Sequence, residues 1–160
     1  MPVKNIWWAN HGQRFNENKS YGCMWAPLEN DTGEKLFHWE NVGKVAKGDI
    51  ILHCVHGKIT HVSRAISGAQ RALEPHIHFN ARMGYLVSCE YHELNVSINI
   101  KNIGKKLYYP GRKYWPINKN GDPNQGFLYK FAQDGLNTLI KAYPAIFWPQ
   151  DFKKLWGWGQ

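Results

Sequence analysis

The sequence predicts an α+β fold in which a curved, mostly antiparallel sheet or open barrel is flanked by short helices. An apolar run over 50–55 is followed by a His-Gly reversal at 56–57. The run over 58–66 then alternates apolar and polar residues, which is the pattern of a β-hairpin. Apolar residues at helical spacing appear near the end of the chain, over 128–143. Strands and helices in this order indicate a mixed fold.

The other elements follow from apolar runs and from the residues that interrupt them. Strands are expected over 3–9, 23–25 and 84–94, short helices over 38–45 and 100–107, and helices over 128–143 and 145–160. Polar, Pro-rich or Gly-rich stretches predict a turn over 29–34, a loop or one helical turn over 10–20, a loop or short helix over 67–83, and a loop over 109–126. No repeat or linker-like run interrupts the chain. We therefore expect a single domain over 1–160, either alone or as the N-terminal module of a longer protein.

The composition favours a polyanionic partner. Twenty Lys and Arg residues outnumber twelve Asp and Glu, which gives a formal charge of +8. A surplus of this size most often accompanies nucleic-acid binding. Eight Trp, eight Tyr and seven Phe are more aromatic side chains than the core requires. Because aromatic faces stack on bases with about 1–3 kcal/mol each, this composition is typical of a domain that holds unstacked bases.

The sequence argues against a membrane protein and a disulfide scaffold. No apolar run approaches the roughly 20 residues that span a bilayer, and the first residues, MPVKN, contain no apolar signal core. We therefore expect a cytoplasmic protein. The three cysteines, Cys23, Cys54 and Cys89, are odd in number, widely spaced and placed in predicted strands. They are expected to be buried free thiols.

The candidate binding chemistry gathers around the end of the first predicted strand and the next one. The string WWANH at 7–11 is followed by a polar stretch, by YGCMWAP at 21–27 and then by the hairpin over 49–66. This order resembles the EVE and YTH branch of the PUA-like superfamily, whose members bind a single flipped or unpaired base. The resemblance implies that Asn10 hydrogen-bonds the base edge, that Trp25 forms one wall of an aromatic cage, and that Ala26 lends its carbonyl to the exocyclic amine of the base.

This sequence departs from the family pattern in two places. It has one extra residue between Gly22 and Trp25, and its 67–83 connector lacks the Trp that forms the second cage wall in the family. Phe79, His76, His78 or Trp39 would have to supply that wall. The base-binding candidates are Trp8, Asn10, His11, Trp25, Ala26, Trp39, His78 and Phe79. The phosphate-binding candidates are Arg14, Lys19, Arg71, Arg112, Lys113 and Lys119.

Each of these residues also has a plain structural explanation. Trp7 and Trp8 are neighbours on a strand and face opposite ways, so at least one of them is expected in the core. Trp25 and Trp39 are cage walls or core residues, and Asn10 binds a base or caps a turn. The basic residues over 101–119 are either a solvated face or a phosphate track mixed with Tyr and Trp. Trp148, Trp156 and Trp158 are expected to pack or to contact a partner.

A longer series of motifs narrows the resemblance. The strings MWAP at 24–27, FHW at 37–39, KGDIILH at 47–53, YWPINKNG at 114–121 and QGFL at 125–128 are similar to the EVE-like N-terminal modules of bacterial modification-dependent restriction systems. Those modules include the specificity domains of McrB-type GTPases and modules fused to HNH nucleases. The likeness covers roughly the first 130 residues. It implies a reader of a modified, methylated base in duplex DNA, with catalysis in another domain or partner.

Extrusion of the base would suit this task. It costs a few kcal/mol and exposes both faces and the edge of the base, and stacking between aromatic walls repays that cost. A methyl group adds about 0.8 kcal/mol of apolar burial, so a tight cage is needed to detect it.

Two other functions remain open. One is an RNA-binding module that reads N6-methyladenine in single strands, and the other is a small hydrolase of a nucleotide-like ligand. No Gly-x-Ser-x-Gly or paired-carboxylate pattern supports catalysis, although His53 and Cys89 would form a nucleophile pair if the fold brought them together. Cys54 with His56, and Cys89 with His92, lack zinc-site spacing. We therefore expect no metal, no cofactor and no catalytic residue in this domain.

Overall fold

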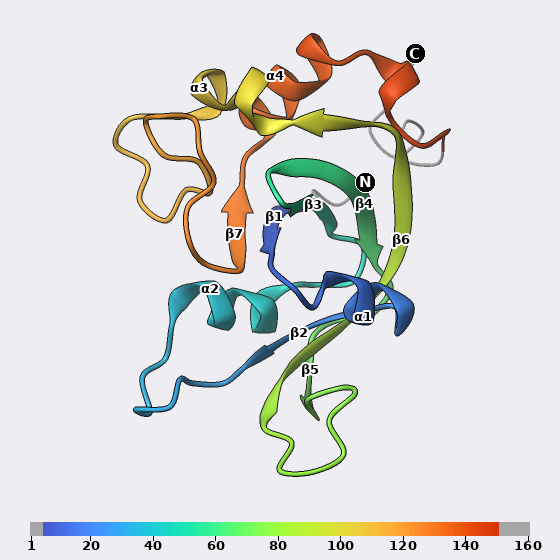
Figure 1. Cartoon of the computed structure of the whole chain (residues 1–160), viewed down its shortest axis with the longest axis vertical. Coiled ribbons are helices and arrows are strands. Elements are labelled where there is room, and N and C mark those ends of the chain that lie inside the picture. Colours follow the sequence, from blue (N-terminus) through green and yellow to red (C-terminus); the bar gives the residue numbers. More distant parts are fainter. Residues whose placement is uncertain (1–4, 151–160) are drawn as a thin grey trace.

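The computed structural model describes residues 5–150, which form one curved sheet with short helices around it (Figure 1). The described strands are β1 (Ile6–His11), β2 (Cys23–Pro27), β3 (Ile50–Val55), β4 (Lys58–Ala65), β5 (Gln70–Leu73), β6 (Met83–Asn99) and β7 (Leu128–Phe131). Their order across the sheet is β2-β6-β4-β3-β1-β7, and β5 pairs with β6 beside that path. Among these strands β1 and β3 run parallel, and every other pair is antiparallel.

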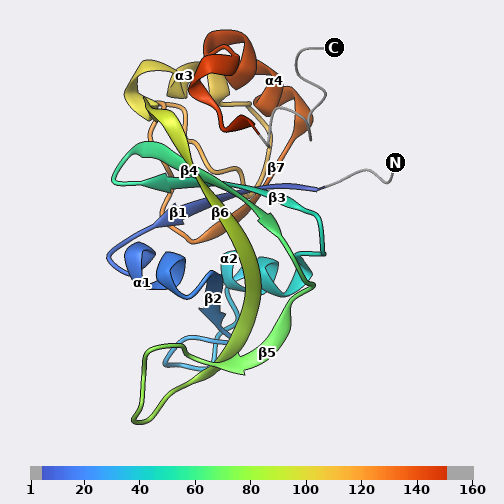
Figure 2. The same ribbon diagram turned by 90° about the vertical axis from the view of Figure 1, so that its right-hand side faces the viewer.

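The strand β6 curves the sheet. Its first residues pair with β2 and β5, whereas residues from Cys89 onward pair with β4. Figures 1 and 2 show this long strand bending across the molecule from the lower part to the upper part. Register shifts between Ile59 and His61 in β4, and between His53 and Cys54 in β3, add local twist. The sheet therefore curls into a half-barrel.

Short helices connect and cover the strands. The described helical segments are α1 (Phe15–Ser20), α2 (Phe37–Glu40), η1 (Asn41–Lys44), η2 (Ile100–Asn102), α3 (Gly104–Leu107), α4 (Gln133–Ala142) and η3 (Ala145–Phe147). Figure 2 shows α3 and α4 together at one end of the molecule and α1 and α2 on the other side of the central strands. The predicted α+β class with a curved, mostly antiparallel sheet and short helices is confirmed.

Two apolar clusters lie on opposite faces of the sheet. The alternation along β1 places Trp8 in the cluster that α4 covers, together with Leu136 and Trp148. It places Trp7 in the other cluster with Met24 and residues of η1. Trp148 is fully buried and its indole N–H donates to the Tyr143 carbonyl at 3.0 Å. The predicted packing role of Trp148 is confirmed, whereas Trp156 and Trp158 lie outside the described residues.

Three expectations about the elements were wrong in part. Residues 10 and 11 belong to β1, because the strand stays paired with β3 as far as Val55, and a helix follows at 15–20 instead of a loop. The connector over 67–83 contains β5, which pairs with the start of β6. Residues 128–131 form β7, because pairing with β1 prevails over their helical spacing, and the helix begins at Gln133.

The remaining elements follow the sequence prediction closely. The strands over 50–55 and 58–65 and the short helices near 38–45 and 100–107 are present. Of the helix expected over 145–160, the structure contains a single turn at Ala145–Phe147, and residues 151–160 lie outside the described part. Among the described helices, none is long and apolar enough to cross a membrane.

All three cysteines are buried and unpaired, as expected. Burial raises the pKa of the Cys23 thiol to about 11 and that of Cys54 to about 12. Both thiols therefore stay protonated and unreactive at neutral pH.

Candidate functional site

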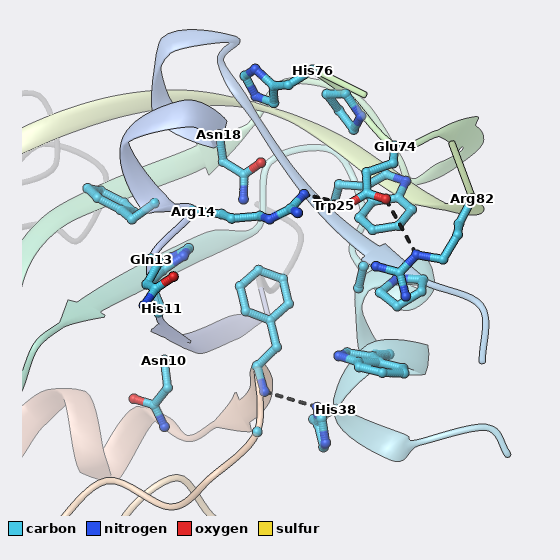
Figure 3. Close-up of a pocket in the computed structure, with 18 residues that line it drawn as sticks. Asn10, His11, Gln13, Arg14, Asn18, Trp25, His38, Glu74, His76 and Arg82 are labelled. Carbon is cyan, nitrogen blue, oxygen red and sulfur yellow. Dashed lines mark hydrogen bonds and ion pairs between the residues drawn. The ribbon is translucent and has the colours of Figure 1, made fainter. Parts of the chain in front are cut away.

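A cavity of about 410 Å³ lies where the end of β1, α1, β2, α2 and the connector between β5 and β6 meet (Figure 3). Five of the eight base-binding candidates line it: Asn10, His11, Trp25, Ala26 and Trp39. Arg14, predicted as a phosphate contact, lines it as well. A cavity of this size is within the range of small-molecule sites. The sequence therefore located the region of the cavity correctly.

Trp25 forms part of the wall and is also well packed. Its side chain is 9% exposed, and its indole N–H donates to the Ala72 carbonyl at 3.1 Å. A Cβ on Gly84 would lie 2.5 Å from the indole ring, so Gly84 is what allows the ring to lie close to β6. The Arg82 guanidinium lies 5.6 Å from the ring centroid, within cation–π distance. A ligand that stacks on Trp25 must therefore share the ring with Arg82.

The Asn10 amide has structural partners. Asn10 lies on the same face of β1 as Trp8, whose indole N–H donates to the Asn10 Oδ1 at 2.7 Å. The Asn10 amide nitrogen donates to the Asn124 carbonyl at 3.0 Å, and Figure 3 shows the side chain turned away from Trp25. One proton and one lone pair of the amide remain available. Asn10 therefore fastens β1 to the 109–126 loop, and this position does not present its amide as a free base-reading group.

The Ala26 carbonyl is directed into the sheet. The Leu28 N–H donates to the Met83 carbonyl at 3.4 Å, and hydrogen-bonded pairs alternate along an antiparallel ladder. Ala26 and Tyr85, two residues away in the same register, therefore also form a hydrogen-bonded pair. The carbonyl that the family resemblance would give to a base amine is thus used first by β6.

Three other base-binding candidates do not line the cavity. Trp8 is fully buried in the opposite core, 5.2 Å from the Phe131 ring centroid, so it is a core residue and we withdraw it from the candidates. His78 and Phe79 are exposed at the tip of the connector, Phe79 at 83%. The Pro75–His76 part of the same connector reaches the cavity instead. Sequence alone could not tell which part of a polar connector folds inward.

An ion-pair cluster lies at the edge of the cavity. Arg14 Nη1 lies 2.5 Å from Glu74 Oε1, and Arg82 Nε lies 3.4 Å from Glu74 Oε2. Glu74 is buried, whereas the two arginines are about half exposed. Figure 3 shows the Arg14 side chain extending toward Glu74 beside Trp25. Glu74 and Arg82 were absent from the sequence candidates, because nothing in the local pattern pairs residues across β1 and β6.

A chain of buried polar side chains begins at the cavity. His11 Nε2 lies 2.7 Å from His53 Nδ1, and His53 Nε2 lies 2.6 Å from Ser63 Oγ. The Phe15 ring of α1 covers His11 at 4.7 Å between centroids. Burial, with smaller Coulombic effects of the neighbouring histidines, lowers the pKa of His11 to about 3 and that of His53 well below its usual value. Both imidazoles are therefore neutral at physiological pH.

His76 is a second polar group at the cavity. Its backbone has a φ of 72°, a left-handed conformation that is uncommon for residues other than glycine. Its Nε2 is buried without a hydrogen-bond partner among the described residues, and its ring contacts Tyr21. A buried unpaired nitrogen costs about 1–3 kcal/mol, which a ligand or a water molecule at this nitrogen would recover.

The remaining basic candidates are dispersed. Lys19 lies over the outer side of α1, 5.8 Å from the Phe15 ring centroid, and Arg71 is exposed on β5. Neither lines the cavity. Arg112 pairs with Asp134 through two contacts of 3.1 and 2.5 Å and stacks 4.3 Å from the Tyr109 ring centroid.

Arg112, Lys113 and Lys119 belong to a second surface. Two hollows of about 460 and 510 Å³ lie around Tyr114, and these three basic residues line them. Tyr114 has a φ of 59° and is 61% exposed. Its ring packs 4.2 Å from Phe37. The structure therefore brings the basic residues of 112–119 together around an exposed aromatic ring, at a place separate from the Trp25 cavity.

The described residues offer no group of three or more His, Cys, Asp or Glu that would hold a metal ion. What the cavity offers is aromatic surface from Trp25, Trp39 and Phe127, guanidinium groups at its edge, and imidazole nitrogens on its walls. This combination suits a flat, polar-edged ligand.

Comparison with known proteins gives a fold likeness. No protein-family model matches the chain, and no curated protein matches it. Among solved structures, the NMR structure of Rpa0253 from Rhodopseudomonas palustris matches with a TM-score of 0.53 and 9% identity, over 86% of this chain and 91% of that one. At this identity the likeness concerns the fold alone.

Proposed function

We propose that this domain recognises a modified, methylated base of duplex DNA by taking it out of the helix into the cavity beside Trp25. In this proposal the curled sheet is a PUA-like fold of the EVE and YTH kind, and the domain is the cytoplasmic specificity module of a modification-dependent restriction system. A nuclease or GTPase domain or partner carries out the catalysis.

The observation that carries the proposal is the cavity itself. It combines aromatic rings, unpaired polar atoms and guanidinium groups in about 410 Å³, within a protein of net charge +8. Stacking on an aromatic wall contributes about 1–3 kcal/mol, and a flipped base also needs hydrogen-bond partners at its edge. The cavity supplies both kinds of contact, and the charge supports attraction to phosphate.

The structure changes which residues the proposal uses. Trp39, which is half-buried, and Phe127 are the more accessible aromatic walls, while Trp25 forms the more deeply packed wall. His11 and His76 replace Asn10 and Ala26 as the edge-reading groups, because the latter two already have hydrogen-bond partners. The Tyr114 surface with Lys113 and Lys119 would follow the phosphates of the flanking DNA.

The test is a binding panel measured by fluorescence anisotropy. One duplex is prepared unmodified and with a single N6-methyladenine, 5-methylcytosine, 5-hydroxymethylcytosine or N4-methylcytosine, and a single-stranded RNA carries N6-methyladenine. We expect one modified duplex to bind more tightly than the unmodified one. Tighter binding of the methylated RNA than of every duplex would favour the RNA-reading alternative, and equal binding of all probes would contradict base recognition.

A variant pair links binding to the cavity. Trp39→Ala should weaken binding of the preferred duplex by about 5- to 150-fold, which is the loss of one stacking contact. Val96→Ala is the matched control, because Val96 is an exposed apolar residue of β6 outside all three hollows. If both variants bind like the wild type, the cavity is not the base site.

A further inference from the structure

We propose that the cavity presents the Nδ1 atom of His11 as a hydrogen-bond acceptor, so that the ligand group placed against it must carry an N–H or O–H donor. The inference rests on the proposed function only where it names that group as an amino or ring N–H of a nucleobase. The direction of the hydrogen bonds behind His11 is a property of the protein itself.

The residues behind His11 form a path across four neighbouring strands. Ala9 of β1 lies opposite His53 of β3, and His11 is two residues beyond Ala9. Each later step repeats this diagonal: His53 lies opposite His61, two residues before Ser63 in β4, and Ser63 lies opposite Tyr91, two residues after Cys89 in β6. Diagonal neighbours on one face of a sheet lie within reach of long side chains. The path therefore runs from the cavity to β6.

The inner end of this path fixes its direction. The Cys89 thiol donates to the Val87 carbonyl at 3.6 Å, and a carbonyl only accepts. The pKa of Cys89 is raised by burial to about 12 and is lowered slightly by a side-chain hydrogen bond from Ser63. The Ser63 hydroxyl thus donates its proton to the sulfur, and its oxygen is left to accept from His53.

The same direction continues through both imidazoles. Because Ser63 Oγ accepts, His53 Nε2 carries the proton, and His53 Nδ1 is then an acceptor in a neutral ring. His11 Nε2 must donate to it, so the proton of His11 is on Nε2 and its Nδ1 has a free lone pair. The low pKa of His11 and His53 excludes the doubly protonated ring at neutral pH. The heavy-atom contacts therefore select one tautomer at each histidine.

The outer end of the path opens to the cavity. His11 is 9% exposed, it lines the cavity, and within residues 5–150 its Nδ1 has no hydrogen-bond partner. The sealed polar atom that lacks a partner in this part of the chain is His76 Nε2, so His11 Nδ1 is not closed off by protein. A buried side chain with one open acceptor at a cavity wall is placed for a ligand donor.

This orientation selects among base edges. The amino groups of adenine and cytosine, with one methyl group or none, keep an N–H that His11 Nδ1 can accept. A doubly methylated amine or a carbonyl oxygen placed at the same point would face a lone pair and leave Nδ1 unpaired. We therefore expect the cavity to favour bases that keep a donor at this edge.

The free protein provides the first test. Long-range 1H–15N NMR spectra distinguish the two imidazole tautomers, and we expect His11 and His53 to carry their protons on Nε2. A proton on Nδ1 of His11 would overturn the proposal. Ser63→Ala removes the acceptor for His53 Nε2, and both rings should then change to the Nδ1–H form. Ser97→Ala, an exposed serine of β6, should leave both tautomers unchanged. If Ser63→Ala does not fold, the wild-type tautomers still decide the matter.

The second test uses a duplex with one N6-methyladenine and the same duplex with N6,N6-dimethyladenine. We expect the His11 Nδ1 signal to move toward lower 15N frequency with the first probe, and about tenfold weaker binding of the second. A bound duplex that leaves this signal unmoved overturns the proposal and leaves base recognition intact. If no duplex binds, the proposed function fails, and the tautomers of the free protein decide the proposal separately.

Discussion

Gly84→Ala tests how the cavity wall is built. Gly84 lies between two strands, opposite Pro27 of β2 and Ala72 of β5. A Cβ at this position would meet the Ala26 carbonyl oxygen at 2.2 Å and two atoms of the Trp25 ring at 2.5 Å. Neither neighbour moves freely, because the carbonyl is part of the β2–β6 ladder and the indole is hydrogen-bonded to β5. Either the strands separate locally or Trp25 leaves its position.

The size of the effect follows from two opposing contributions. Overpacking of a well-packed site costs about 1–3 kcal/mol, and a backbone oxygen as the clashing atom favours the upper half of that range. Replacing Gly by Ala gains about 0.4–1 kcal/mol by restricting the unfolded chain. We therefore expect a net loss of about 1–2 kcal/mol, which lowers the melting temperature by several degrees in a domain of this length.

Urea unfolding and near-UV circular dichroism measure this prediction. Gly84→Ala should lower the unfolding midpoint and change the aromatic signal, because the Trp25 ring is displaced. Gly68→Ala is the matched control, since no atom lies within 4 Å of its added Cβ and its φ is not in the left-handed region. If the two variants unfold at the same urea concentration with identical aromatic spectra, the packing of Trp25 described above is incorrect.

Three further predictions concern charge and protonation. Lys113→Ala with Lys119→Ala should weaken binding to every DNA alike and flatten its salt dependence, and a loss confined to modified DNA would contradict phosphate contact. Glu74→Gln should lower the free energy of unfolding by about 1 kcal/mol, the low end for charge-assisted bonds because Arg14 and Arg82 are about half exposed. Glu90→Gln, in an exposed pair with Arg64 at 3.4 Å, should change it by less than about 0.5 kcal/mol. The folded protein keeps His11 and His53 neutral, so unfolding takes up protons once the pH falls below the ordinary histidine value of 6.5. Stability is complete above that pH and decreases toward the His11 pKa of about 3, and a urea midpoint that stays constant or rises from about pH 7.5 to 5.5 would refute the buried neutral pair.

The sequence predicted the elements that depend on local patterns. The hairpin over 50–65 follows from a tight reversal between an apolar run and an alternating run. Asp49 was expected to be a turn residue, and the structure shows its carboxylate accepting from the Ala46 N–H and from the Trp7 indole, each at 2.9 Å. Both depend on residues close in sequence or on one buried side chain.

Pairing between distant segments could not be predicted in the same way. Residues 128–131 have helical spacing, but they are buried against β1, 120 residues earlier in the register that pairs Leu128 with Ala9 and Tyr129 with Trp8. The start of β6 similarly draws residues 70–73 into the sheet. Burial on a sheet edge outweighs local preference, which is worth a fraction of a kcal/mol per residue.

The candidate site was predicted in its region and not in its details. The resemblance directed attention to Asn10, Trp25 and Ala26, which all line the cavity. It did not predict that two of them are hydrogen-bonded elsewhere. The His11–His53–Ser63 path and the Glu74 cluster join residues from different strands, and only the register of the sheet brings them together.

The central claim is that a base leaves the duplex to enter the cavity beside Trp25 and Trp39. The most direct measurement is the NMR signal of the imino proton in the modified base pair, followed as protein is added to the duplex that binds best. The account predicts that this signal disappears on binding while imino signals of distant pairs persist, and that Trp39→Ala at an equal bound fraction restores it. If the modified pair keeps its imino signal in the complex, the base has stayed in the helix and the account is wrong.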